Sequence, residues 1–180
     1  YVYILSGRNW FLEQFIPNPT GATNDAFGIA AHLDGTRLVI GSPGDDDGGT
    51  DAGAAYVYDF DGTAWVQTAK LLASVAKAGD VFGDDVKIQG DRIVVGARGG
   101  DIVADDSAGS AYVFEFDGSS WIETAKLLAS DGASNDFLGR PIALDGDRIS
   151  VSAVNQDSNG TTGGGAVYVF EKFGGQWAET

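Results

Sequence analysis

Short apolar runs separated by glycine and aspartate predict an all-β chain. Residues 37–41, 92–96 and 148–152 each begin with arginine and continue as almost uninterrupted apolar runs. A run without alternation predicts a strand that is covered on both faces. Asp-Gly pairs lie just before these runs and predict tight hairpin turns, and aromatic, β-branched runs such as residues 54–60 predict further strands. No part of the pattern requires a helix longer than one turn.

The runs belong to an internal repeat. Residues 52–74 and 108–130 align without gaps, and 16 of the 23 aligned positions are identical. Four tryptophans recur at spacings of 55, 56 and 56 residues: Trp10, Trp65, Trp121 and Trp177. This period is too long for leucine-rich, ankyrin or tetratricopeptide units and fits a four-stranded propeller blade. We therefore predict an all-β fold of β-propeller blades, each made of four antiparallel strands.

The alignment divides the chain into two complete and two partial blades. Residues 1–18 form the last two strands of a preceding blade, residues 19–74 the first repeat and residues 75–130 the second. Residues 131–180 form the third repeat, whose outer strand is truncated. Propellers close with about four to eight blades. We expect the missing blades to lie outside this sequence, or the open ends to be covered by another chain.

Composition narrows the classes of function. The chain is 43% hydrophobic and has no apolar run near 18 residues, which argues against disorder and membrane insertion. Its 26 acidic and 11 basic residues give a net charge of −15, so nucleic acid is not an expected partner. With no cysteine and a single histidine, His32, the usual nucleophile and base pairs cannot be built. We expect no enzyme, and we expect His32 to be exposed and without a role.

Two short elements resemble a known family. The first stands as Phe27-Gly28 and Phe82-Gly83, and the second as Gly41-Ser42-Pro43 and Gly96-Ala97-Arg98. The third repeat departs from both, with Leu138-Gly139 and Ser152-Ala153-Val154. The chain resembles the FG-GAP repeats of integrin α-subunit-like β-propellers. The resemblance implies an extracellular or cell-surface protein that binds its ligands on one loop face of the propeller.

The calcium loops of that family cannot be carried over. They follow the pattern Asp-x-Asp-x-Asp-Gly between the first and second strands of a blade. Here this connection consists of residues 33–37, 88–92 and 144–148, which are turns too short to surround a cation that needs six to eight oxygens. We expect the arginine after each turn to pair with the turn's own acidic residues.

A different loop offers carboxylates for a metal. Asp45, Asp47 and Asp51 lie in the glycine-rich loop 42–53, and their mutual repulsion would be relieved by a cation such as Ca²⁺. The aspartate spacing differs in every repeat, so a solvated acidic loop without metal is the preferred interpretation. If calcium binds, we expect it in this loop and its counterparts.

Sorting the aspartates by predicted loop places most of them on one face. We predict that the ligand-binding residues of this face are Asp25, Asp80, Asp101, Asp105, Asp106, Asp136 and Asp157. Our leading hypothesis is a non-enzymatic extracellular recognition or adhesion module that binds a protein or glycan. The first alternative is a structural subunit that assembles with other copies of itself on a cell surface. The second is a carbohydrate-active propeller enzyme.

Overall fold

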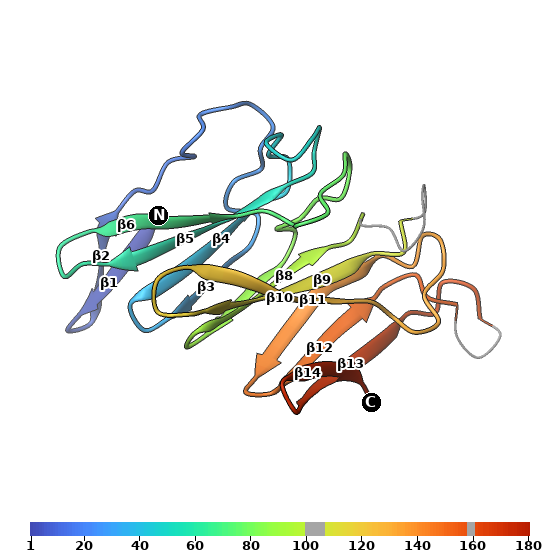
Figure 1. Ribbon diagram of the computed structural model, residues 1–180. Coiled ribbons are helices and arrows are strands. Elements are labelled where there is room, and N and C mark those ends of the chain that lie inside the picture. Colours follow the sequence, from blue (N-terminus) through green and yellow to red (C-terminus); the bar gives the residue numbers. More distant parts are fainter. Residues whose placement is uncertain (100–106, 158–160) are drawn as a thin grey trace.

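The chain forms three four-stranded antiparallel sheets and one two-stranded sheet, arranged in chain order (Figure 1). The structure, a computed structural model, describes residues 1–99, 107–157 and 161–180, and every regular element in these ranges is a β-strand. The strands are β1 (Val2–Ser6), β2 (Asn9–Gln14), β3 (Ala31–Asp34), β4 (Arg37–Ser42), β5 (Ala54–Phe60), β6 (Trp65–Leu71), β7 (Val86–Gln89), β8 (Arg92–Ala97), β9 (Ser110–Phe116), β10 (Trp121–Leu127), β11 (Leu138–Asp145), β12 (Arg148–Ala153), β13 (Ala166–Phe173) and β14 (Gln176–Glu179).

Each complete sheet is a meander in which every strand pairs with the next one in the chain. The orders are β3-β4-β5-β6, β7-β8-β9-β10 and β11-β12-β13-β14. This confirms the predicted blades of four antiparallel strands. The sheets do not close into a ring, so the molecule is a partial propeller (Figure 1).

The second strand of each blade has the predicted buried character, with one informative difference. Every residue of β4 and β8 after the leading arginine is buried. In β12, Ile149 and Val151 are buried whereas Ser150 and Ser152 are partly exposed. The reason is that β4 and β8 have a sheet on both sides, but only one face of β12 is covered by another described sheet.

Two glycines set how closely neighbouring blades approach. Within a blade, Gly28 N donates to Gly41 O and Gly83 N donates to Gly96 O, each at 2.9 Å. Between blades, a Cβ on Gly41 would lie 1.9 Å from Gly83 O, and one on Gly96 would lie 1.9 Å from Gly139 O. No real Cβ approaches a backbone oxygen so closely. The second-strand glycine is therefore required wherever another blade packs on that face.

Apolar side chains fill the space between neighbouring blades. Val39 and Val57 of the first complete sheet belong to one core with Phe82, Val86 and Ile93 of the second. An equivalent core joins the second and third sheets around Val94, Val113, Leu138 and Val151. A third and smaller core joins β1 and β2 to β4, β5 and β6. Burial of these residues is the main stabilising contribution, because the hydrophobic effect scales with the apolar area removed from water.

The arginine of each second strand connects two blades, so the expectation that it pairs with its own turn is wrong. Arg37 contacts Asp59 Oδ1 in its own sheet (3.0 Å) and Asp91 Oδ1 in the next sheet (2.9 Å). Arg92 likewise contacts Glu115 (2.9 Å) and Asp147 (3.1 Å). The arginine side chain points forward, over the following blade, and so reaches the turn of that blade.

Tryptophans of the following blades lie beneath these arginines. The Arg37 guanidinium is 5.1 Å from the ring centroid of Trp121, and that of Arg92 is 4.9 Å from Trp177. A planar cation over an indole face is an attractive arrangement. Two of the four repeating tryptophans therefore belong to blade junctions.

Polar groups on the first strands also bind across the junctions. Asp34 Oδ2 accepts a hydrogen bond from Gly90 N, and Gln89 Oε1 accepts one from Gly146 N, each at 2.6 Å. His32 Nδ1 accepts a hydrogen bond from Ile88 N at 3.3 Å. The expectation that His32 is exposed and without a role is therefore wrong. Its side chain helps to join the first two complete blades.

Candidate ligand-binding loop face

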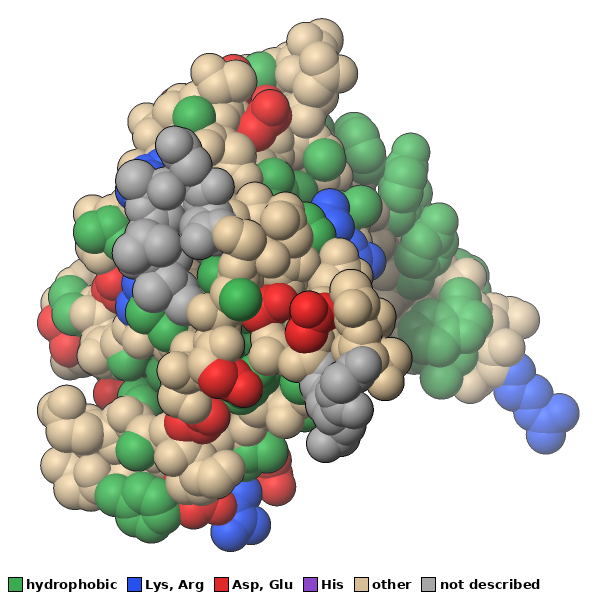
Figure 2. Space-filling view, turned by 90° about the vertical axis from the view of Figure 1, so that its right-hand side faces the viewer, with side chains coloured by type: hydrophobic (Ala, Val, Ile, Leu, Met, Phe, Trp, Pro, Cys, Tyr) green, Lys and Arg blue, Asp and Glu red, His purple; other side chains and the backbone are tan. Residues whose placement is uncertain are grey.

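The connections between blades and the loops between second and third strands gather at one edge of the sheets. We call this edge the loop face, and it comprises the described residues of 15–30, 43–53, 72–85, 98–109, 128–137 and 154–165. Figure 1 shows these loops at the upper right ends of the strands, and Figure 2 views the molecule from that side. Acidic side chains are spread over this face (Figure 2).

Backbone hydrogen bonds fix the loops to one another. Within each blade, the loop after the second strand donates to the loop before the first strand: Gly44 N to Asp25 O (3.0 Å), Gly99 N to Asp80 O (3.1 Å) and Asn155 N to Asp136 O (3.2 Å). Between blades, Phe82 N donates to Ala52 O and Leu138 N donates to Ala108 O, at 2.9 and 2.8 Å. The loop face is therefore one connected surface rather than a set of independent loops.

Three of the predicted ligand-binding aspartates stabilise these loops from inside. Asp25, Asp80 and Asp136 are 4%, 3% and 4% exposed. Asp80 Oδ2 accepts a hydrogen bond from Lys77 N (2.8 Å), and Asp136 Oδ2 accepts one from Ala133 N (2.6 Å). Asp25 Oδ2 accepts hydrogen bonds from the side chains of Asn18 and Thr20. Their carboxylates shape the surface, and direct ligand contact by them stays a prediction.

Asp45 lies in a buried polar network with a lysine and a tyrosine. The residue is 1% exposed, and its carboxylate accepts hydrogen bonds from Lys70 Nζ (2.8 Å) and Tyr56 Oη (2.6 Å). Burial raises the pKa of Asp45, but the bonds from Lys70 and Tyr56 outweigh it and the net pKa is lowered. Burial, followed by the bond to Asp45, raises the pKa of Tyr56 to about 12. The network therefore holds Asp45 ionised and Tyr56 protonated at neutral pH.

This network bears on the predicted calcium residues. Lys70 Nζ also contacts Asp47 Oδ2 at 2.5 Å, so an ammonium group lies between the Asp45 and Asp47 carboxylates. Asp51 is exposed, and its backbone N–H donates to Asp46 Oδ1. Within residues 1–99, 107–157 and 161–180, no group of three or more His, Cys, Asp and Glu side chains could hold a metal ion. The described loop does not fit calcium, because Lys70 already neutralises two of its carboxylates.

A polar hollow on the third blade brings two predicted site residues together. Asp136 and Asp157 both line a cavity of 430 Å³, together with Asn135, Asn155 and Gln156. Asp157 is exposed and its Oδ1 accepts a hydrogen bond from Gly163 N at 2.8 Å. Gln156 is 6% exposed, and its Oε1 is buried without a hydrogen-bond partner. The predicted residues Asp101, Asp105 and Asp106 lie outside the described residues.

Sequence reasoning missed the lysine and tyrosine of the Asp45 network. Lys70 lies 25 residues from Asp45 and Tyr56 lies 11 residues from it. The repeat offered a signal, because Tyr56, Tyr112 and Tyr168 share one position and Lys70 and Lys126 share another. In the third blade Tyr168 Oη donates instead to Asp131 Oδ1 (2.6 Å), so the tyrosine again binds a loop carboxylate.

Comparison with known families agrees with this architecture. The FG-GAP repeat model matches residues 10–58, 65–114 and 121–170, which together cover most of the chain. The chain belongs to the FG-GAP repeat family. No curated protein matches it. The described residues also contain no helix long and apolar enough to cross a membrane.

Each matched segment is offset from a sheet. A segment begins at the tryptophan of an outer strand and ends in the third strand of the next blade. The sequence unit therefore includes a blade-to-blade connection. This explains why the residues that set the junction recur with the motif.

Proposed function

We propose that this integrin-like β-propeller module recognises a protein or glycan ligand through its loop face and performs no catalysis. The observation that carries the proposal is the connected set of loops, whose backbone hydrogen bonds repeat in all three blades. Binding residues are often placed on loops that a rigid scaffold positions. FG-GAP repeats are in general not catalytic units and are typical of extracellular or surface proteins. We accordingly place the module outside the cell.

The polar hollow of the third blade is the part of the loop face that best fits a ligand. Asn135, Asn155 and Asp157 offer amide donors and carboxylate and amide acceptors at its wall. Gln156 Oε1 is a buried acceptor without a partner, and such a group costs free energy until a donor reaches it. Sugar hydroxyls and peptide amides both supply such donors.

The charge of the face restricts the ligand further. The chain carries a net charge of −15, and Figure 2 shows acidic side chains across the loop face. Such a surface repels anionic ligands and attracts cationic ones. We therefore expect neutral glycans or basic segments of proteins to bind, and sulfated or phosphorylated ligands not to bind.

The test compares two edges of the same blade. Binding to glycan arrays and to basic peptides is measured with and without calcium for the native chain, for Asn155→Ala/Asp157→Ala and for Asp145→Ala. Asp145 is exposed at the hairpin edge of the third blade, away from the hollow, and serves as the matched control. We expect the double variant to lose binding at least about tenfold and the control to keep it. Equal binding by all three proteins would remove the hollow from the proposal.

A second candidate function is a structural subunit, and one observation favours it. The small sheet β1–β2 exposes many large apolar side chains, among them Tyr3 (54%), Trp10 (67%) and Leu12 (54%). Exposed apolar patches of this kind mark sites of association. Sedimentation velocity over a range of concentrations separates the two functions, because a structural subunit forms growing assemblies without any ligand.

A further inference from the structure

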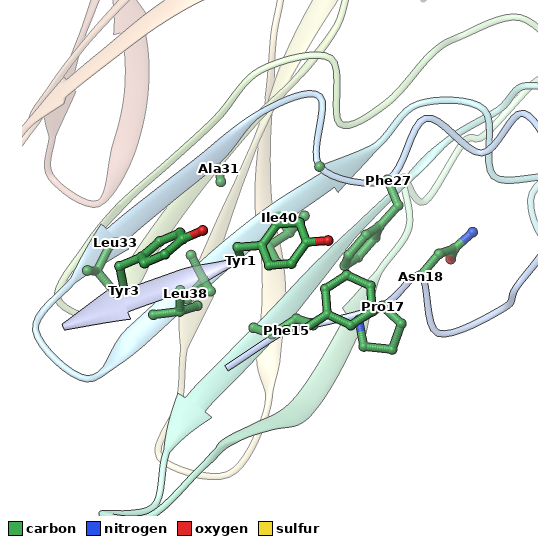
Figure 3. Close-up of a pocket in the computed structure, with 13 residues that line it drawn as sticks. Tyr1, Tyr3, Phe15, Pro17, Asn18, Phe27, Ala31, Leu33, Leu38 and Ile40 are labelled. Carbon is green, nitrogen blue, oxygen red and sulfur yellow. The ribbon is translucent and has the colours of Figure 1, made fainter. Parts of the chain in front are cut away.

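An apolar groove lies between β1 and the inner strands β3 and β4. It has a volume of 650 Å³, and its wall includes Tyr1, Tyr3, Phe15, Phe27, Leu33 and Ile40. Figure 3 shows the aromatic rings and aliphatic chains of these residues facing one hollow. Tyr3 and Leu33 are each 54% exposed. Among the described strands, β1 pairs with β2 alone, so its other edge offers free backbone groups at the groove.

The groove occupies the position that an inner hairpin fills at the complete junctions. The sequence of residues 1–3, Tyr-Val-Tyr, aligns with residues 56–58 of β5, and β5 has β4 on the edge that is free in β1. The hairpin β3–β4 packs on β7 in the next sheet, and Val39 shares a core there with Val86 and Ile88. The groove therefore continues an interface that the molecule forms twice elsewhere.

We propose that this groove binds an antiparallel β-hairpin of the same repeat type, supplied by a polypeptide segment other than residues 1–180. Its second strand adds to the free edge of β1, and its apolar side chains cover Leu33, Leu38 and Ile40. Strand addition to an open edge satisfies backbone donors and acceptors, and pockets for alternate side chains then select the sequence.

The groove also selects one residue of that hairpin. At the complete junctions the second-strand arginine lies opposite an acid of the third strand, Asp59 for Arg37 and Glu115 for Arg92. In β1 the equivalent position is Ile4. The arginines also contact Asp91 and Asp147 in the next turn, and there the first complete blade has Thr36.

Both carboxylates that hold the junction arginine are thus neutral residues at the groove. Glu13, the only acid of β2, already accepts a hydrogen bond from Trp65 Nε1 at 3.0 Å. A guanidinium in this place would lose the partners that stabilise it elsewhere. The hairpin that fits the groove therefore carries an uncharged residue where the other blades carry arginine.

The experiment grafts a hairpin of this chain onto its own groove. Tyr1 aligns with Tyr112, so a copy of residues 78–111 placed directly before Tyr1 reproduces the natural spacing. Two fusions are compared, one with the native arginine in the copy and one with R92L in the copy. We expect the leucine fusion to raise the Tm above that of the unfused chain by at least about 4 °C and to slow amide exchange in β1. We expect the arginine fusion to be clearly less stable than the leucine fusion.

A reversal in the host tests the specificity. Ile4→Asp with Thr36→Asp restores both carboxylates, and the arginine fusion should then become the more stable of the two. Circular dichroism of the unfused double variant shows whether it folds; if it does not, the two fusions in the native host still decide. Failure of both fusions to protect the β1 amides would overturn the hairpin site. Equal stability of both fusions in the native host would overturn its preference for an uncharged residue.

Discussion

The junction between the second and third complete sheets and the outward face of the third sheet are built from equivalent positions with different residues. At the junction, β8 presents Val94 and Gly96 to the next blade. On the outward face, β12 presents Ser150 and Ser152 at the same positions. The third strand changes as well, from Ala111, which is fully buried, to Val167, which is 64% exposed. The blade framework is kept while its ability to receive a neighbour changes.

The polar part of the junction does not change in parallel. Arg148 keeps the position of Arg37 and Arg92 and contacts Glu171 in its own sheet at 2.6 Å. Its side chain is 72% exposed, against 23% and 17% for the other two. The difference teaches that the arginine acquires its second carboxylate and its tryptophan only from the following blade. Close approach of two blades depends on the glycine.

Loss of the junction glycine should have the largest effect. In Gly96→Ala the new Cβ would lie 1.9 Å from the backbone oxygen of Gly139, and neither backbone can move without disturbing its sheet. We expect a loss of at least about 3 kcal/mol in the free energy of unfolding, or failure to fold. Urea denaturation provides the measurement.

The matched control is Ser152→Ala, at the equivalent position on the outward face. We expect it to change the free energy of unfolding by less than about 0.5 kcal/mol. Similar losses in both variants would show that the glycine is needed within the blade rather than between blades.

A charge in the junction core should have the next largest effect. Val94 is fully buried, and Val94→Asp places a carboxylate among apolar side chains without a partner. We expect destabilisation of about 3 kcal/mol, together with a raised pKa of the new carboxyl. Thermal denaturation at pH 7 measures the loss, and Ser150→Asp is the control on the outward face. A small effect of Val94→Asp would mean that the two sheets separate readily.

Removal of the junction arginine should have a moderate effect. In Arg92→Met the contacts with Glu115, Asp147 and Trp177 are lost, while much of the apolar stem is kept. Because Asp147 is 69% exposed, solvent screens that pair, and we expect a loss of only about 1–2 kcal/mol. Arg148→Met should change stability by less than about 0.5 kcal/mol. A larger loss in Arg148→Met than in Arg92→Met would contradict the comparison.

The sequence was sufficient for the framework of the blades because a repeat of about 55 residues, its apolar runs and its Asp-Gly turns all report local structure. It was not sufficient for contacts that depend on the relative placement of blades. Whether Arg37 reaches back to Asp34 or forward to Asp91 depends on the strand face from which its side chain projects. The interpretation of Asp45 as a calcium ligand failed to consider Lys70 for the same reason, since only the folded sheet places that ammonium group beside the loop.

The smallest expected effect concerns acid and again separates the junction from the outward face. Burial raises the pKa of Glu115, but hydrogen bonds from Lys172 (2.6 Å) and Arg92 (2.9 Å) outweigh it and lower the net pKa below its usual range. A lowered folded-state pKa contributes stability that is present above the unfolded-state value of 4.5 and is lost as the pH falls through the folded-state value. The stability difference between the native chain and Glu115→Gln should therefore be constant above about pH 5.5 and shrink as the pH is lowered from about 4.5 to 3. Urea denaturation at each pH gives this difference, and Glu171→Gln controls for loss of a carboxylate at the equivalent outward position. A difference as large at pH 3 as at pH 7 would show that the junction does not depend on the charge of Glu115.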